Sequence, residues 1–262
     1  MERDQGSVFG EAADLYDRRR PGYPPAVFEE IVGEAALSPG DAILEVGAGT
    51  GLATAELLRL GLRVTALEPS VAMAAAARRR LATQTGLHLV ESSFERWEPQ
   101  GAVFRAVVAA QAWHWVDPAL RYERAAAVLP PGGTLALIWN RPEGGDEAIR
   151  SELDDVYRRQ APELEARPPG ELDLDRTREI LESGRFSAPH RSEVHFELAY
   201  SSEAYRELME TQSDHRLLPE ASRRRLLSAV AEVIRHNGDR YRTSWVTLLY
   251  LSRRLGGTDP FP

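Results

Sequence analysis

Three alternating glycines follow an apolar run in the first quarter of the chain. They are Gly47, Gly49 and Gly51, within the stretch ILEVGAGTGLAT (43–54). Glycines at a turn between a strand and a helix let the backbone approach a ligand closely and direct free N–H groups at it. Glu68 ends the next apolar run, and a carboxylate in that place can accept hydrogen bonds from both hydroxyls of a ribose. These residues therefore indicate a site for a nucleotide-like ligand.

The spacing of the glycines separates three ligands: a dinucleotide, a nucleoside triphosphate and S-adenosylmethionine. A dinucleotide loop has the pattern GxGxxG, in which the third glycine stands where this chain has Leu52. A triphosphate loop needs GxxxxGK[ST], and the sequence contains no lysine at all. The loop is thus poorly suited to phosphates and still suited to an adenosine with its tail.

A second group of residues that could do chemistry lies in QAWHWVDP (111–118). Aromatic faces favour cations, and His114 could remove a proton from an incoming hydroxyl or amine. The alternative is that Trp115 and His114 only pack beneath the following helix. Both interpretations stay open on the sequence.

Composition limits the other kinds of chemistry. The chain has 262 residues, 43% of them hydrophobic, so it can build a sizeable core. Its formal net charge of −8 disfavours binding to nucleic acid. Without cysteine there are no thiolate nucleophiles or cysteine-bound metals, and the histidines have no metal-ligand spacing, so we expect no metal. With no signal-like start or membrane-length apolar run, we expect a cytoplasmic protein that does not bind membranes, as a monomer or homodimer.

Short β-rich runs alternate with helical stretches from Ala42 to Asn140. This order predicts a doubly wound, mostly parallel sheet of the α/β class. Strands are expected at 42–46, 62–68, 87–92, 106–111 and 134–140, and helices at 53–61, 70–84 and 119–129. Beyond Asn140 the pattern predicts a helix within 143–160, a strand at 192–201, helices at 202–212 and 219–236, and a strand at 241–254. The late helices are expected to form a cap over the carboxyl ends of the strands.

Taken in order, these motifs resemble the class I S-adenosylmethionine-dependent methyltransferases, in particular the small-molecule branch called type 11. LEVGAGTG (44–51) is similar to the first motif of that family, ALEPS (66–70) to the second and ESSFERW (91–97) to the third. The resemblance covers most of the chain. It implies a seven-stranded Rossmann-like sheet with an inserted helical cap, and S-adenosylmethionine as the cofactor.

The resemblance also implies a set of cofactor-binding residues. Met73 would pack on the adenine face or simply fill the core, and the adenine amino group would meet Ser93 or the backbone of Phe94, where the family commonly has Asp. Arg20 would bind the methionine carboxylate with its two-pronged guanidinium, or lie at a solvated helix end. The predicted cofactor-binding set is Tyr16, Arg20, Glu45, Gly47, Ala48, Gly49, Gly51, Glu68, Pro69, Met73, Ser93, Phe94 and Gln111.

The methyl acceptor is expected at the ends of the fourth and fifth strands and in the cap. In-line methyl transfer needs mainly orientation and a dry pocket, so a base is not required. If one is used, His114 is the candidate catalytic residue. The predicted acceptor-binding residues are Trp113, His114, Asn140, Arg141 and His215.

The leading hypothesis is methyl transfer from S-adenosylmethionine to an O or N atom of a small metabolite. The alternatives are a carboxyl methyltransferase of the trans-aconitate type, which would want several converging arginines, and a non-catalytic protein that binds the cofactor. The expected domain organisation is an entry segment (1–35), a cofactor-binding core (36–141), a helical insertion (142–190), the last two strands with cap helices (191–254) and a tail (255–262).

Overall fold

The computed structural model describes residues 15, 18–165 and 176–256. Strands and helices alternate through the first part of the chain. They are α3 (Pro25–Glu34), β1 (Ala42–Val46), α4 (Leu52–Arg59), β2 (Arg63–Leu67), α5 (Val71–Arg80), β3 (Leu87–Val90), β4 (Ala106–Ala110), the 3-10 helix η1 (Trp113–Trp115), α6 (Arg121–Ala127) and β5 (Thr134–Gly145).

The second part has longer helices and two more strands. They are α7 (Glu147–Gln160), α8 (Pro162–Glu165), α9 (Thr177–Glu182), β6 (His190–Tyr200), α10 (Ser202–Glu210), α11 (Ser213–Leu217), α12 (Glu220–His236) and β7 (Tyr241–Arg253). The helices and strands predicted from the sequence are all present, with shifts of a few residues at their ends. The largest shift is at β5, and α3 and α11 are helices that were not predicted.

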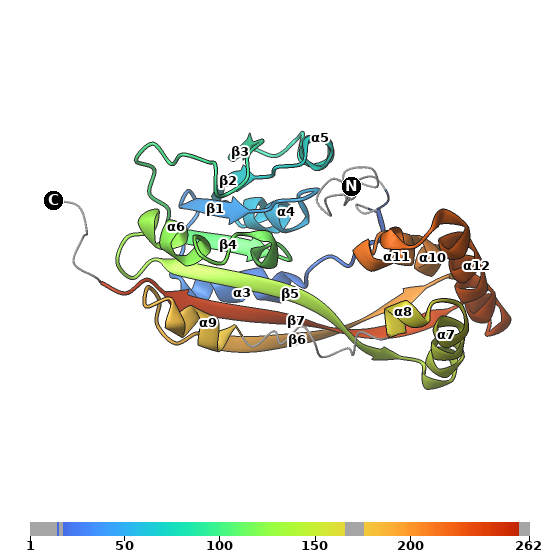
Figure 1. The fold of residues 1–262 in the computed structure, drawn as a ribbon. Coiled ribbons are helices and arrows are strands. Elements are labelled where there is room, and N and C mark those ends of the chain that lie inside the picture. Colours follow the sequence, from blue (N-terminus) through green and yellow to red (C-terminus); the bar gives the residue numbers. More distant parts are fainter. Residues whose placement is uncertain (1–14, 16–17, 166–175, 257–262) are drawn as a thin grey trace. The chain divides into compact units, whose positions relative to one another are not determined.

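The strands form one seven-stranded sheet in the order β3-β2-β1-β4-β5-β7-β6 (Figure 1). The pairs from β3 to β5 are parallel. β7 runs antiparallel to β5. Gly132, just before β5, donates its N–H to Arg254 O after the end of β7, and the residue after β5, Asp146, donates to Arg242 O near the start of β7. The predicted α/β class with a mostly parallel Rossmann-like sheet is confirmed.

β5 is longer than the sequence predicts. The predicted strand ends at Asn140, whereas β5 continues to Gly145, and α7 begins only at Glu147. Two causes are visible. The glycine pair at 144 and 145 is a poor helix former, and Gly145 lies so close to β7 that a Cβ there would be 2.5 Å from the Tyr241 hydroxyl.

Apolar side chains on both faces of the central strands explain why helices flank the sheet. Every residue of β4 is buried, as are the first seven of β5. On one face, residues from β1, β2, β4, β5 and β7 pack with α3 and α4. This cluster includes Val27, Phe28, Ile31, Ile43, Leu57, Val64, Val108, Ile138, Leu249 and Leu251.

The chain divides into two compact units. One, the α/β unit, contains residues 22–140, 176–194 and 247–256 among those described. The other, the helical unit, contains residues 15, 18–21, 141–165 and 195–246 of the described chain. Strands β5, β6 and β7 each pass from one unit to the other within their length.

The helical unit has its own core between α7 and α12. Ile149, Leu153 and Val156 lie on one stripe of α7, and α12 presents a matching stripe, as amphipathic helices do when they pair. The α12 residues are Leu226, Val230 and Ile234, and Tyr241 of β7 joins them.

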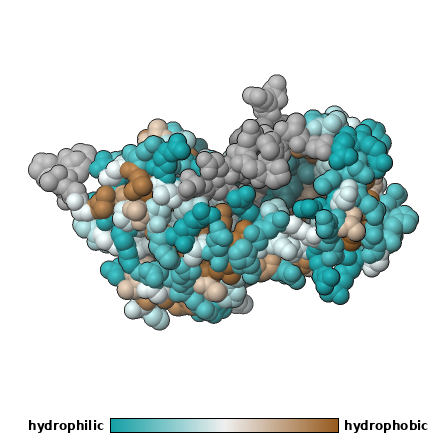
Figure 2. Space-filling model, turned by 90° about the horizontal axis from the view of Figure 1, so that it is seen from below, coloured by the Kyte–Doolittle hydropathy of each residue, from teal (hydrophilic) through white to brown (hydrophobic). Residues whose placement is uncertain are grey.

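Large hydrophobic side chains on the surface are scattered. Examples among the described residues are Val71, Val103, Trp115, Leu120, Leu181, Leu217 and Leu255. On the face drawn in Figure 2, hydrophilic residues predominate and hydrophobic ones form small separate groups. In the described part of the chain, every helix is too short or too polar to cross a bilayer.

Candidate functional site

The glycine loop connects β1 to α4 and is fixed to β2. The N–H groups of Gly47 and Ala48 both donate to Leu67 O at 2.9 Å. Gly47, Gly49 and Gly51 have φ angles of +72°, +59° and +84°, a region that residues with a Cβ rarely adopt. The backbone conformation at these three positions therefore favours glycine over every other residue.

One of these glycines is packed tightly and another faces open space. A Cβ on Gly47 would lie 2.4 Å from the Ala112 Cβ, so the loop touches the segment that follows β4. A Cβ on Gly49 would meet no atom within 4 Å. The loop is thus buttressed at Gly47 and open beside Gly49, where a ligand can reach the backbone.

The carboxylate of Glu68 lies against this open part of the loop. Oε2 accepts a hydrogen bond from Gly49 N–H and Oε1 accepts one from Ser70 N–H, each at 2.8 Å. A carboxylate has about four acceptor positions, so each oxygen can accept a further bond from a hydroxyl. Burial raises the pKa of Glu68, and the two backbone N–H donors oppose that change. Glu68 therefore holds the loop and can still bind a diol.

Glu45 is fully enclosed and has a different setting. Its side chain lies at the end of β1 with 1% of the residue exposed, and Oε2 accepts a 2.6 Å hydrogen bond from the Thr54 hydroxyl on α4. Burial, with a smaller contribution from the charge of Glu68, raises its pKa to about 8, against the effect of the Thr54 hydrogen bond. At neutral pH Glu45 is thus mostly protonated, and it connects the strand to the helix on either side of the loop.

The residues predicted to contact adenine lie along the next elements. Pro69 is exposed before α5, and Met73 is buried in the first turn of that helix, where the Ser70 hydroxyl accepts from Met73 N–H. Ser93 and Phe94 follow β3; Phe94 is 3% exposed, and its carbonyl accepts from Arg124 at 2.8 Å. The adenine contacts stay a prediction.

Gln111 and Asn140 are linked at the ends of β4 and β5. Gln111 has a positive φ of 54°, and its amide Nε2 donates to Asn140 O at 2.8 Å. The Asn140 side chain is 8% exposed; it donates to Gly22 O and accepts from the Thr247 hydroxyl. Asn140 was predicted to face the methyl acceptor. In the structure its amide instead connects β5 to Gly22, which precedes α3, and to Thr247 of β7.

Trp113 was also predicted to line the acceptor site, and here the structure disagrees. Its ring is fully buried, 5.4 Å from the Tyr122 ring and 6.2 Å from that of Phe94. A side chain with no exposed surface cannot touch a ligand without repacking. Residues Trp113–Trp115 form a 3-10 helix. Its turn directs Trp113 into the core and leaves His114 and Trp115 at the surface.

His114 is held in its neutral form. Its Nδ1 accepts a long, 3.4 Å hydrogen bond from Trp139 Nε1–H, which assigns the ring proton to Nε2. Partial burial, and then the charges of Arg176 and Arg121, lower its pKa to about 4. An imidazole with this pKa is a weak base near neutral pH and a good hydrogen-bond donor through Nε2–H.

Several predicted residues belong to the helical unit. Arg20 donates from Nε to the Thr211 hydroxyl and from Nη2 to Thr211 O, both at 2.9 Å. His215 is buried between the Tyr157 hydroxyl at 2.7 Å and Asp214 at 2.8 Å. Arg141 lies in β5, where that strand passes into the helical unit. Tyr16 lies outside the described residues. The roles predicted for these four residues stay predictions.

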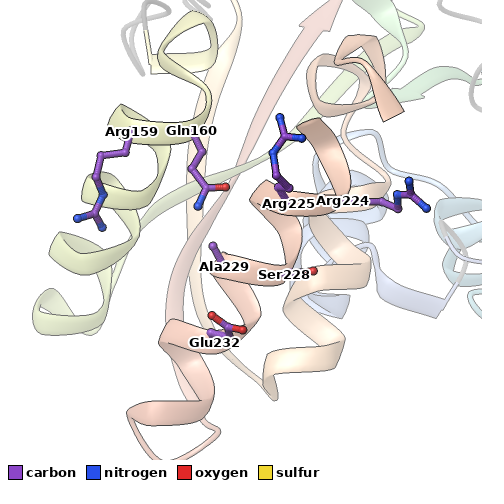
Figure 3. A pocket seen from close by; sticks show the side chains of 7 residues that line it. All are labelled: Arg159, Gln160, Arg224, Arg225, Ser228, Ala229 and Glu232. Atoms are coloured by element: carbon purple, nitrogen blue, oxygen red, sulfur yellow. The ribbon is translucent and has the colours of Figure 1, made fainter. Parts of the chain in front are cut away.

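A separate hollow of 590 Å³ lies in the helical unit between α7 and α12 (Figure 3). In that view the Arg224 side chain extends away from α7. None of the residues predicted from the sequence lines the hollow, which is bounded by Arg159, Gln160, Arg224, Arg225, Ser228, Ala229 and Glu232. Over the described ranges, no group of three or more His, Asp or Glu side chains is arranged to hold a metal.

Sequence reasoning missed four residues of the site. Thr54, which donates a hydrogen bond to Glu45, lies in a helical stretch with no distinctive sequence motif. Arg121, Arg176 and Glu179 form a charged cluster beside His114, described below. Arg121 and Glu179 are 58 positions apart, so no local pattern in the sequence could have connected them.

Comparison with known proteins agrees with this geometry. Residues 43–133 match the model of a family described as a methyltransferase domain. An uncharacterized methyltransferase of Mycobacterium tuberculosis is 39% identical over 138 residues, which are 53% of this chain and 54% of the relative. A protein-L-isoaspartate O-methyltransferase of Methylorubrum extorquens is 36% identical over 129 residues, 48% of this chain and 53% of the relative. The chain thus spans about half the length of these curated relatives.

Solved structures share the fold. A protein of Anaeromyxobacter dehalogenans named as a type II methyltransferase aligns with a TM-score of 0.64 and 24% identity, over 91% of this chain and 99% of that one. A phosphoethanolamine N-methyltransferase of Haemonchus contortus, solved with S-adenosylhomocysteine, aligns with a TM-score of 0.57 and 14% identity, over 97% of this chain and 61% of that one.

The fold is that of the Rossmann-like methyltransferases, and the loop resembles the one with which class I S-adenosylmethionine-dependent methyltransferases hold their cofactor. Residues 43–133, which contain the loop and Glu68, are the part of the chain that matches the methyltransferase-domain model. The residues present fit the cofactor, because the space beside Gly49 and the remaining acceptor positions of Glu68 are what an adenosine with its ribose needs.

Proposed function

We propose that the protein transfers the methyl group of S-adenosylmethionine to an O or N atom of a small-molecule acceptor. The observation that carries the proposal is the pairing of Glu68 with Gly49 N–H beside open space, on a loop of the GxGxG type. The cofactor supplies an activated methyl group on a sulfonium. The chain would hold it through the loop backbone and Glu68, with Met73 and Phe94 as buried apolar surroundings.

Proton removal from the acceptor is a smaller part of this proposal. His114, with its low pKa and Nε2–H, is better suited to donating a hydrogen bond to the acceptor than to acting as its base. Methyl transfer to an amine or an already ionised oxygen needs no strong base. The residues of the chain then contribute mainly by orienting the acceptor.

Calorimetry with S-adenosylmethionine, S-adenosylhomocysteine and NAD tests the cofactor. We expect both adenosyl compounds to bind and NAD to bind far more weakly. Glu68→Gln should weaken cofactor binding about 10- to 100-fold, since a hydrogen bond to a charged group contributes about 1.5–3 kcal/mol. Glu29→Gln, on the exposed side of α3, is the matched control and should leave binding unchanged.

Transfer of a labelled methyl group then tests the acceptor class. The relative named protein-L-isoaspartate O-methyltransferase makes a protein acceptor the second candidate. We expect label in the small-molecule fraction of a metabolite mixture and little in added peptides. Label in isoaspartyl peptides alone would replace the small-molecule proposal, and tight NAD binding with no binding of either adenosyl compound would refute the cofactor.

A further inference from the structure

Two arginines from distant parts of the chain share one carboxylate in the α/β unit. Arg121, at the start of α6, donates from Nη2 to Glu179 Oε1 and from Nη1 to Trp113 O at 2.8 Å. Arg176, just before α9, donates from Nη1 to Glu179 Oε2 at 2.9 Å. Two cations and one anion give this trio a formal charge of +1, and the Asp117 carboxylate lies near enough to Arg121 to act on its pKa.

This positive charge is largely removed from water. The Arg121 and Arg176 side chains are only 5% and 16% exposed. In both, the Nε atom is buried without a hydrogen-bond partner among the residues that the structure describes. An enclosed charge with unused donors is costly for a protein, and an anion bound at the Nη2 side of Arg176, which is not among the buried unpaired atoms, would lower that cost. The local charge is also opposite in sign to the net charge of −8.

The trio lies beside the end of β4 and close to the glycine loop. The Arg176 guanidinium is 5.4 Å from the centre of the Trp139 ring, and Trp139 donates to His114 Nδ1. His114 is two residues beyond Ala112, which touches the loop at Gly47. Arg176 and the Nε2–H of His114 are therefore neighbouring donors beyond the end of β4, at the edge where parallel sheets bind ligands.

We propose that the methyl acceptor carries a carboxylate and that Arg176, assisted by His114 Nε2–H, binds it; this inference rests on the proposed function. A guanidinium matches a carboxylate with two parallel N–H···O bonds. Arg121 is a positioning residue, because its bonds to Trp113 O and Glu179 hold the carboxylate that orients Arg176.

The test compares paired acceptors. Hydroxy- and amino-substituted carboxylic acids of three to six carbons, each with its carboxamide, are offered with methyl-labelled S-adenosylmethionine, so that the methyl group can pass to the hydroxyl or amine while the carboxylate is held by Arg176. We expect the acids to be favoured over the amides, and Arg176→Gln to lower kcat/KM for the acids about 10- to 100-fold. Arg176→Lys, which keeps the charge, should recover part of the loss. Arg178→Gln, on the exposed side of α9, is the matched control.

A binding measurement separates this inference from the methyl-transfer proposal. An acid bound at Arg176 offsets the charge beside His114, so adding it should raise the His114 pKa measured by NMR, with the resonance assigned through His114→Gln. Amides as good as acids, an unchanged acid preference in Arg176→Gln, or no panel acid that moves the His114 titration would each overturn the inference. Failure to bind S-adenosylmethionine would instead refute the proposed function, while the NMR result still decides whether the anion site exists.

Discussion

Glu45 illustrates how a buried carboxyl makes the fold sensitive to pH. Its pKa is about 8 in the folded chain, raised mainly by burial from a usual value of 4.5. The folded state therefore binds this proton more tightly than the unfolded state does. The resulting stabilisation is complete below about pH 4.5 and is lost as the pH rises through 8.

Glu45→Gln should remove that pH dependence. We expect the free energy of unfolding of the wild type to fall by on the order of 3 kcal/mol between pH 5 and 8 from this group, and the variant to be flatter by that amount. Urea unfolding at several pH values measures it. Glu29→Gln, on the exposed side of α3, is the control. Parallel pH profiles for wild type and Glu45→Gln would contradict the prediction.

His114 gives a second prediction at the scale of one residue. A general base contributes about 10²- to 10⁴-fold to a rate, and the pKa of about 4 makes His114 unsuited to that role at neutral pH. We expect His114→Gln to lower kcat less than about tenfold between pH 6 and 8, with the larger change in KM for the acceptor. A hundredfold loss of kcat with unchanged KM would restore His114 as the base.

The glycine loop is the element whose geometry decides cofactor binding, and two of its positions can be told apart. Gly47 and Gly49 both have positive φ, so alanine is strained by about 1–2 kcal/mol at either position. Only at Gly47 does the new methyl group also collide with Ala112. Gly47→Ala should thus reduce both thermal stability and cofactor affinity. Gly49→Ala should reduce affinity with a smaller loss of stability, as scanning calorimetry and titration with S-adenosylhomocysteine would show.

Elements of this fold could be predicted from the sequence because their signals are local. The alternation of apolar runs and helical stretches predicts the strands from β1 to β4, and Ser70 marks the start of α5 correctly. The extension of β5 to Gly145 depends on β7, which comes about a hundred residues later in the chain. The link between Arg121, Arg176 and Glu179 is equally non-local, and so the charged part of the site was missed.

At the scale of the whole molecule, the α/β unit needs residues from both ends of the chain. Leu249 and Leu251 of β7 and Val27, Phe28 and Ile31 of α3 pack into one core with the central strands. Each such side chain contributes about 1.5–3 kcal/mol when fully buried, while domains are stable by only about 5–15 kcal/mol. The fragment 36–141, the core predicted from the sequence, should therefore not fold alone. Circular dichroism and denaturant unfolding against the full chain would show this, and a cooperative transition in the fragment would refute it.

The helical unit has a consequence for how such proteins can diversify. Its described residues, 15, 18–21, 141–165 and 195–246, come from separate stretches of the chain, so no single gene segment encodes it. Because α7 of one stretch and α12 of another bury each other's apolar faces, a recombination event that exchanges only one of them joins mismatched halves. Chimeras with relatives should thus stay folded when both stretches come from the same parent. Functional recombination should then transfer the helical unit as a whole, although the stretches that encode it are separated in the gene.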